Sequence, residues 1–152
     1  MKNAELYDEG FYEEQSGGSV ESADIFLSHL FSLYKPESIV DFGCGVGSWL
    51  SSAARHGVED LTGLDGEWVD PERLLSNKIK FKPVNFETKL NLEDEFDLAI
   101  SLEVAEHIQE QFAENFVKNI CKASKVVLFG AAIPGQGGVN HVNEQFQEYW
   151  IE

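Results

Sequence analysis

The sequence predicts an α/β fold, a three-layer α/β/α sandwich in which helices cover both faces of a mostly parallel sheet of about five strands. Three observations predict it. Short apolar or β-branched runs alternate along the chain with segments of helical periodicity. Residues 126–129 are apolar at every position, which is typical of a strand buried on both faces. A run of alternating glycines separates the first predicted strand from the helix that follows it.

The first predicted helix covers residues 20–34. Its apolar residues recur at helical spacing, and they are Ala23, Phe26, Leu27, Leu30, Phe31 and Tyr34. Residues 1–19 end in Ser-Gly-Gly-Ser and are expected to form a flexible or lid-like segment. Its candidate lid side chains are Tyr7, Phe11 and Tyr12. Residues 20–152 are then expected to form one domain.

The later elements alternate between strand and helix. Strands are expected at 38–42, 59–65, 79–84, 96–102 and 125–133. Helices are expected at 47–57, 71–76, 107–124 and 143–152. Asp70 before Pro71 is a typical helix start, with an N-cap followed by proline at the first helical position. The apolar side of the 107–124 helix is predicted to consist of Ile108, Phe112, Phe116, Ile120 and Cys121.

Composition and charge exclude several classes of partner. A chain of 152 residues with 43% hydrophobic residues suits one folded domain. Its net charge of −16 argues against nucleic acids and anionic membranes, since both would be repelled. No apolar run approaches the roughly 20 residues of a membrane helix. The acidic start does not fit a signal peptide, so we expect a cytoplasmic protein.

Cysteine and histidine spacing gives no signal for a metal site. The two cysteines, Cys44 and Cys121, are far apart, and the four histidines are scattered along the chain. We therefore expect no bound metal. Cys44 lies among glycines, where its small side chain suits a tight turn, so a packed and reduced cysteine is expected there.

The run VDFGCGVGSWL, residues 40–50, is the strongest functional signal. In a parallel sheet, ligands bind beyond the carboxyl ends of the strands, and glycines let backbone N–H groups approach a ligand closely. The run lacks the Gly-Lys-Ser/Thr ending of a P-loop. It also departs from the dinucleotide pattern G-x-G-x-x-G, because position 48 is serine. The alternatives are a tight turn without a ligand, or a domain that binds NAD or a nucleotide sugar.

The pattern D-x-G-x-G-x-G, from Asp41 to Gly47, resembles that of class I S-adenosylmethionine-dependent methyltransferases of the small-molecule type. The resemblance covers about residues 38–150. It implies a Rossmann-like, mostly parallel sheet with strand order 3-2-1-4-5. It also implies a sheet truncated relative to the seven strands of the family, because no sixth or seventh strand follows residue 133.

The resemblance implies a set of residues that contact the cofactor. Asp65 lies 22 residues after Gly43, where the family has a carboxylate that accepts hydrogen bonds from both ribose hydroxyls. Trp68 and Phe86 are candidates for the walls of the adenine site, and Asn85 offers an amide oxygen to the adenine amino group. The full set is Asp41, Gly43, Cys44, Gly45, Gly47, Asp65, Gly66, Trp68, Asn85, Phe86, Leu102 and Glu103.

Two histidines are candidates for a catalytic base. The segment SLEVAEHI resembles the stretch after the fourth strand in small-molecule methyltransferases, which places His107 beside the reactive methyl group. His141 follows a glycine-rich loop after the fifth strand. Histidine titrates near neutrality and suits proton transfer, although a structural histidine bonded to a carbonyl is the alternative for each. Glu106 is expected only to favour the helix dipole, and His29 and His56 are expected to be structural.

The resemblance implies an enzyme that transfers a methyl group from S-adenosyl-L-methionine to a small-molecule or biosynthetic-intermediate acceptor and releases S-adenosyl-L-homocysteine. The alternative is a cofactor-binding domain without independent catalysis, such as a fragment or a subunit that needs a partner. The uncovered edge of the fifth strand predicts a homodimer. Exposed aromatic residues near the C-terminus are a second candidate contact, namely Phe146, Tyr149 and Trp150.

Overall fold

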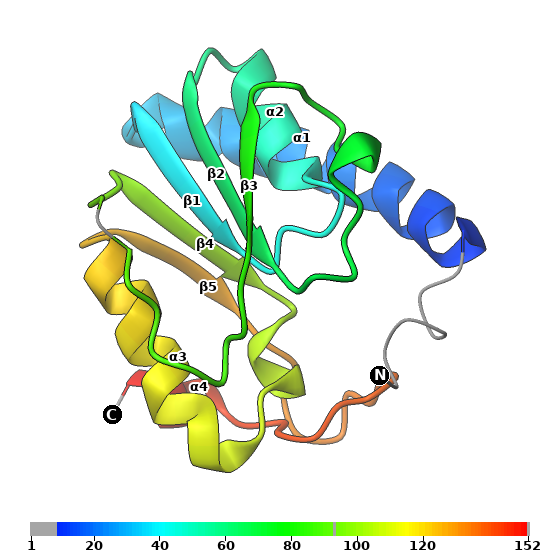
Figure 1. Ribbon diagram of the computed structural model, residues 1–152, viewed down its shortest axis with the longest axis vertical. Helices are drawn as coiled ribbons and strands as arrows, with labels where there is room; N and C mark the ends of the chain where they lie inside the picture. The colour runs from blue at the N-terminus through cyan, green and yellow to red at the C-terminus, as the bar shows by residue number, and fades with distance from the viewer. Residues whose placement is uncertain (1–8, 93, 152) are drawn as a thin grey trace.

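The computed structural model describes residues 9–92 and 94–151. Its five parallel strands form one sheet in the order β3-β2-β1-β4-β5, which confirms the predicted order (Figure 1). The strands are β1 (Ser38–Phe42), β2 (Asp60–Asp65), β3 (Ile79–Pro83), β4 (Leu98–Leu102) and β5 (Val127–Gly130). Because all strands are parallel, their carboxyl ends lie at the same edge of the sheet.

Helices cover both faces of this sheet and complete the predicted three layers. The helices are α1 (Glu9–Leu33), α2 (Ser48–Arg55), α3 (Glu110–Ala123) and α4 (Gln147–Ile151). Figure 1 shows α1 and α2 on one face and α3 and α4 on the other. Two short 3₁₀ turns, η1 (Pro71–Arg73) and η2 (Ala105–His107), follow β2 and β4.

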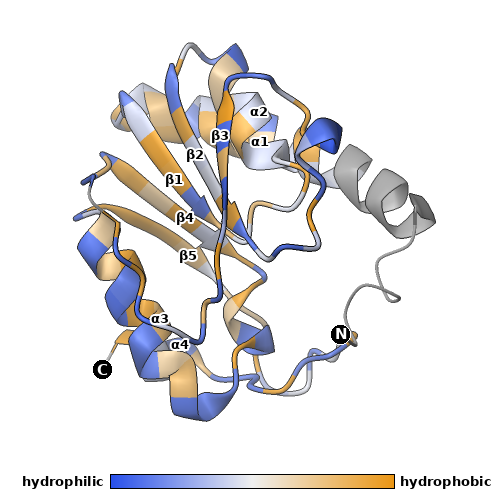
Figure 2. Cartoon of the chain, in the orientation of Figure 1, coloured by the Kyte–Doolittle hydropathy of each residue, from blue (hydrophilic) through white to orange (hydrophobic). Residues whose placement is uncertain are grey.

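Two apolar cores lie on opposite faces of the sheet, because successive strand residues point to opposite sides. Ile39 packs toward α1 and α2, against Leu27 and Leu50. Its neighbour Val40 belongs to the core that contains Phe116 of α3. Figure 2 shows hydrophobic colours along the inner strands of the sheet and hydrophilic colours on the outer side of α3.

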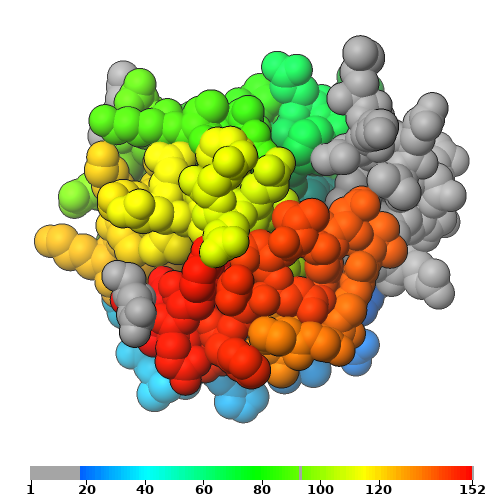
Figure 3. Space-filling view, turned by 90° about the horizontal axis from the view of Figure 1, so that it is seen from below, coloured from blue at the N-terminus to red at the C-terminus, as the bar shows by residue number. Residues whose placement is uncertain are grey.

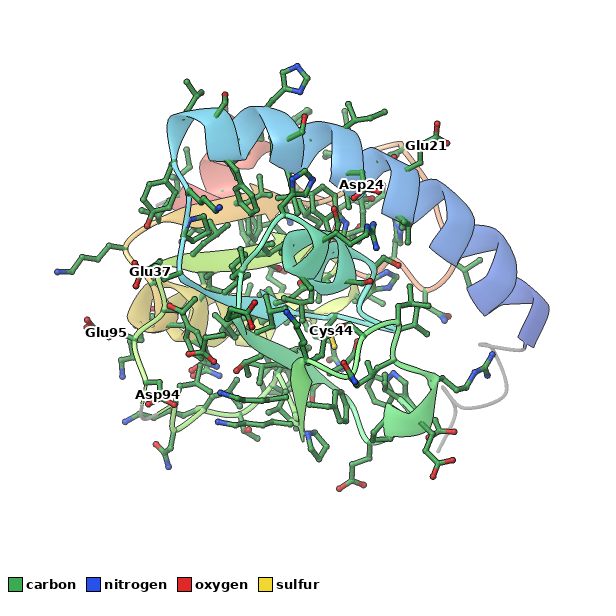
Figure 4. All side chains as sticks on the ribbon, turned by 90° about the horizontal axis from the view of Figure 1, so that it is seen from above. Glu21, Asp24, Glu37, Cys44, Asp94 and Glu95 are labelled. Carbon is green, nitrogen blue, oxygen red and sulfur yellow. The ribbon has the colours of Figure 1, made fainter. Side chains whose placement is uncertain are left out.

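Helix α1 begins at Glu9, earlier than the predicted start at residue 20. The Ser-Gly-Gly-Ser stretch is helical, because glycine costs a helix only about 1 kcal/mol and does not forbid it. The helix is fixed to α2 by Asp24, which accepts hydrogen bonds from Ser52 and, at 2.8 Å, from Arg55 (Figure 4). Of the predicted lid residues, Tyr7 and the side chains of Phe11 and Tyr12 lie outside the described part.

The predicted helix at 71–76 is only the short turn η1. Its start is as predicted, since Oδ1 of Asp70 accepts a hydrogen bond of 3.0 Å from the amide of Glu72. The turn ends because Leu74 has an extended backbone. A capped start with proline therefore does not ensure that a helix continues.

Three predictions of burial are wrong. Val126 and Val127 are exposed, because β5 is the edge strand and has a neighbouring strand on one side only. Cys121 is exposed, since α3 turns Phe116 and Ile120 toward the sheet instead. Trp150 is buried rather than exposed, and its ring packs 5.7 Å from that of Phe129. Within the described ranges, no helix has the length and apolar character needed to cross a bilayer.

Candidate cofactor and acceptor site

The glycine loop, residues 43–47, connects β1 to α2 with positive φ angles of 87°, 52° and 81° at Gly43, Gly45 and Gly47. A Cβ on Gly43 would lie 2.3 Å from Val104 Cγ2, and one on Gly47 would lie 2.5 Å from Ile79 Cδ1. A Cβ on Gly45 would meet nothing within 4 Å. The branched side chain of Val104 therefore leaves no room for a Cβ at Gly43, whereas at Gly47 the left-handed backbone is the stronger reason for glycine, since Cδ1 of Ile79 is the end of a flexible side chain. Gly45 borders open space that a ligand can enter.

The glycine loop is tied to the end of β2 by three of its backbone amides, and a fourth amide, that of Gly66 just after β2, shares the same acid. The amides of Gly43 and Cys44 donate to the carbonyl of Leu64 at 2.7 and 3.1 Å. The amides of Gly45 and Gly66 donate to the two carboxylate oxygens of Asp65 at 2.8 and 2.7 Å. Each oxygen of Asp65 keeps a lone pair for a further donor. The site therefore combines a carboxylate acceptor with an open backbone, which fits a ligand that carries hydroxyl groups.

These hydrogen bonds change the expected role of the loop amides. The amide of Gly47 also has an internal acceptor, the carbonyl of Cys44 at 2.8 Å. The amides of Gly43, Cys44, Gly45 and Gly47 therefore bind within the protein, instead of being free for a ligand as the sequence suggested. At these positions a ligand can come close to the backbone and contact its carbonyl oxygens, which suit a cationic group.

Two buried acids lie at the carboxyl ends of β1 and β2. Burial, together with the neighbouring charge of Asp65, raises the pKa of Asp41 to about 8. Burial also raises the pKa of Asp65, against the opposing effect of the amides of Gly45 and Gly66. The same burial raises the pKa of the Cys44 thiol, so this cysteine is a packed thiol as predicted (Figure 4). A positively charged ligand would stabilise the ionised form of these acids, whereas a phosphate would oppose it.

The predicted adenine-site residues differ in their positions. Trp68 is 49% exposed, and its ring lies over Gly66, where an added Cβ would be 2.1 Å from Cη2. The ring of Phe86 is buried and packs 5.3 Å from Phe116 in the core beside α3. Trp68 is thus accessible to a ligand, whereas Phe86 has the core packing that the sequence could not distinguish from a binding role.

Asn85 is exposed after β3, and its side-chain oxygen accepts a hydrogen bond of 2.9 Å from the amide of Glu87. That oxygen therefore stabilises the local turn. A second lone pair is left for a ligand, so the predicted contact with an amino group is geometrically open.

The segment after β4 brings acids and a histidine next to the glycine loop. Val104 packs so closely on Gly43 that no Cβ would fit between them. Half-buried Leu102 ends the strand, and Glu103 follows with a φ of 57°. Burial and the nearby carboxylate of Glu106 raise the pKa of Glu103. Strain and like-charge proximity of this kind are typical of functional sites.

His107 and His141 lie together, with ring centroids 5.0 Å apart. Nδ1 of His107 lies 3.2 Å from the carbonyl of Asn140, and Nδ1 of His141 lies 2.8 Å from Oε1 of Glu144. Nε2 of His141 is 3.9 Å from Oε1 of Glu106. The two histidines that the sequence selected separately thus belong to one cluster with Glu106.

Sequence reasoning missed Glu106 and Glu144. Glu106 was assigned only to the helix dipole, yet its side chain is fully buried. Glu144 orients His141 and accepts hydrogen bonds of 2.9 Å from the amides of Gly135 and Gly137. The spacings Glu-x-x-Glu-His at 103–107 and His-x-x-Glu at 141–144 are the signals that could have revealed them.

Residues 20–150 match a protein family described as a methyltransferase domain. The chain belongs to the methyltransferase domain family. S-adenosylmethionine is the cofactor of this family, in agreement with the resemblance of the glycine loop. The match covers the glycine loop, the acid at the end of β2 and the acid–histidine cluster, by which we mean Glu103, Glu106, His107 and His141. A search of curated protein sequences finds no significant match.

Solved structures similar to this methyltransferase domain include several methyltransferases. An O-methyltransferase family protein from Burkholderia thailandensis has 13% identity and a TM-score of 0.61, over 76% of this chain and 36% of its own. The plantazolicin methyltransferase BpumL, in complex with a monoazolic desmethylPZN analog and SAH, has 23% identity and a TM-score of 0.58, over 74% of this chain and 45% of its own. The methyltransferase domain of bacterial CtHen1 has 18% identity and a TM-score of 0.63, over 87% of this chain and 80% of its own.

At these identities the similarity shows the fold alone. The chain spans less than half of the length of the first two proteins and most of the third.

Proposed function

We propose that this methyltransferase domain transfers the methyl group of S-adenosylmethionine to a small-molecule acceptor. The observation that carries the proposal is the contact between Gly43 and Val104. It brings the open glycine loop and Asp65 beside the acid–histidine cluster that begins at Glu103. A ligand site and a set of proton-binding groups thus share the carboxyl edge of the sheet, where a donor and an acceptor can meet.

The residues present fit this cofactor. Asp65 has lone pairs for the ribose hydroxyls, and Trp68 offers an accessible ring to the adenine. Carbonyl oxygens of the glycine loop suit the positive sulfonium and ammonium groups, and a bound cation would favour the ionised form of Asp41, whose pKa is raised to about 8 in its absence. A phosphate in the same place would be repelled, which disfavours NADP-like ligands.

The cofactor supplies an electrophilic methyl group, so the protein's task is to align the acceptor, exclude water and receive a proton. Alignment alone contributes roughly 7–11 kcal/mol to such reactions, whereas a positioned base adds about 10²–10⁴-fold. The sequence-based hypothesis assigns the base to His107 or His141. Each ring has a nitrogen that can accept a proton, because its Nδ1 donates to an acceptor and its Nε2 therefore keeps the lone pair.

The acceptor is expected to be a small molecule, because a chain with a net charge of −16 repels nucleic acids and anionic membranes. The cytoplasmic location of the protein stays a prediction.

A second candidate function is cofactor binding without independent catalysis. The exposed edge of β5 favours it, since a partner or further strands could complete the sheet there.

Titration calorimetry with S-adenosylmethionine, S-adenosylhomocysteine and NAD, followed by a turnover assay over a panel of small acceptors, tests the proposal. We expect binding of the two sulfur compounds and methylation of at least one acceptor. Binding without transfer to any acceptor would favour the binding-domain alternative. Preferential binding of NAD would contradict both the methyltransferase proposal and the binding-domain alternative.

A further inference from the structure

We propose that Glu106, His107 and His141 bind a divalent transition-metal ion. One donor atom from each residue lies within 4.8 Å of the other two. The three residues come from η2 and from the loop after β5, so only the fold brings them together. This reverses the expectation from the sequence, which weighed cysteine spacing and the separation of the histidines.

The tautomers of both histidines suit metal binding. Carbonyl and carboxylate oxygens only accept hydrogen bonds, so the Nδ1 atoms that face Asn140 and Glu144 must carry the protons. The lone pair of each ring is then on Nε2. A metal-binding histidine commonly donates its other N–H to a backbone carbonyl or a carboxylate in this way. Both arrangements are present here, one on each ring.

Glu106 supplies the second, independent observation. Its side chain is fully buried, and its carboxylate oxygens have no hydrogen-bond donor among the described residues except the carboxyl of Glu103, which is itself an acid. A buried carboxylate without a donor is strongly unfavourable unless it is protonated or binds a cation. Nε2 of His141 lies 3.9 Å from Oε1, too far for a hydrogen bond. Two ligand atoms that are each about 2.0–2.2 Å from a tetrahedral ion are roughly 3.4 Å apart, so a small inward movement of the two side chains brings them to ligand spacing.

The supporting contacts hold the cluster in place. The carbonyl of Glu106 accepts hydrogen bonds from the amides of Val142 and Asn143 at 2.9 and 3.0 Å, which fixes the segment that carries His141. Glu144, which orients His141, is itself held by the amides of Gly135 and Gly137. Figure 3 shows the segment after β5, in orange and red, against α3 in yellow. The ligands therefore rest on fixed supports, as in metal sites with an organised outer shell.

Two imidazoles and one carboxylate favour Zn²⁺, Mn²⁺ or Co²⁺ over Mg²⁺ and Ca²⁺, which prefer oxygen ligands. Three protein ligands leave at least one position open. If the proposed methyl transfer is correct, that position lies at the carboxyl end of β4, where it can hold an oxygen of the acceptor. The site then favours acceptors that carry a hydroxyl group, and the histidines serve as ligands rather than as the base.

Calorimetric titration of the untagged, chelator-treated protein with ZnCl₂ and CoCl₂, in the absence of cofactor, tests the site. We expect one ion per chain and visible absorption bands from bound Co²⁺. His107→Ala, His141→Ala and Glu106→Gln should each weaken binding at least tenfold. His29→Ala and His56→Ala, in histidines outside the cluster, should leave it unchanged. Diffraction at the zinc edge should place the ion among the three side chains.

The controls separate folding from binding and metal from cofactor. Glu106→Gln keeps the shape of the side chain and removes a buried charge, so thermal unfolding should show a folded variant. Failure of the folded wild-type protein to bind either ion, or equal binding by the cluster variants, would overturn the metal site. S-adenosylmethionine affinity measured in excess chelator reports on the methyltransferase proposal separately, since the glycine loop and Asp65 are not among the metal ligands.

Discussion

The amide of Gly45 donates a hydrogen bond of 2.8 Å to Oδ2 of Asp65. This contact joins the loop after β1 to the end of β2, so the residue proposed to bind the ribose also fixes the shape of the glycine loop. The other oxygen of Asp65 accepts from Gly66. Cofactor affinity and loop geometry therefore depend on the same carboxylate.

Replacing Asp65 with alanine should weaken S-adenosylmethionine binding about tenfold or more, because hydrogen bonds to a charged group contribute roughly 1.5–3 kcal/mol. Calorimetric titration measures the change. Asp60→Ala, at the other end of β2, is the matched control and should keep wild-type affinity, since Asp60 pairs with Lys80 at the surface. Unchanged affinity in Asp65→Ala would remove the ribose assignment.

Two glycine substitutions should have opposite consequences. Gly45→Ala should fold, with a left-handed backbone penalty of about 1–2 kcal/mol, and should bind cofactor at least tenfold more weakly because its methyl group enters the ligand space. Gly43→Ala should lower the unfolding temperature by several degrees more, since its Cβ collides with the branched side chain of Val104. Thermal unfolding and titration of both variants check this. A Gly45→Ala variant with normal affinity would show that the open space is not the binding site.

Asp41 should make the stability of the cofactor-free protein fall as the pH rises. Its folded pKa of about 8 lies above the ordinary value of 3.8. The unfolded chain therefore releases this proton first, and the group's contribution declines between those pH values by up to about 1.4 kcal/mol per unit. Above pH 8 the decline ends.

Urea unfolding from pH 5 to pH 8 measures this effect. Asp41→Asn should be more stable than the wild-type protein, by an amount that grows with pH over this window. Asp94→Asn, at an exposed acid, should follow the wild-type profile. Parallel curves for wild type and Asp41→Asn would contradict the raised pKa.

The exposed edge of β5 should support self-association. Val127 is accessible on this strand, and an unpaired edge attracts a second strand. Light scattering at tens of micromolar should report a dimer, and Val127→Lys should shift it toward the monomer. Leu33→Lys, on the exposed end of α1, should leave the dimer intact. Phe146→Lys tests the second predicted contact, the exposed aromatic residue just before α4, and should likewise shift the dimer toward the monomer if that residue forms the interface. A monomeric wild-type protein at that concentration rejects both contacts.

Part of the fold follows from local patterns. The first strand was predicted at 38–42 and is β1 with those bounds, because a β-branched run between a proline and a glycine has few alternatives. Exposure was harder to predict. The run 126–129 is as apolar as a central strand, and only the sheet order shows that it lies at the edge. Likewise, Phe86 is an aromatic residue near a predicted ligand site, and only packing shows it in the core.

The sequence by itself determined the parallel α/β architecture, the glycine loop after β1 and the acid that closes β2, because each depends on residues that are neighbours in the chain. Tertiary structure alone decided that Glu106, His107, His141 and Glu144 form one cluster. Their segments are more than thirty residues apart, and their meeting depends on how the loop after β5 folds back onto η2. Local propensity carries no information about such a contact, whereas the hydrogen bonds from Val142 and Asn143 to Glu106 establish it directly.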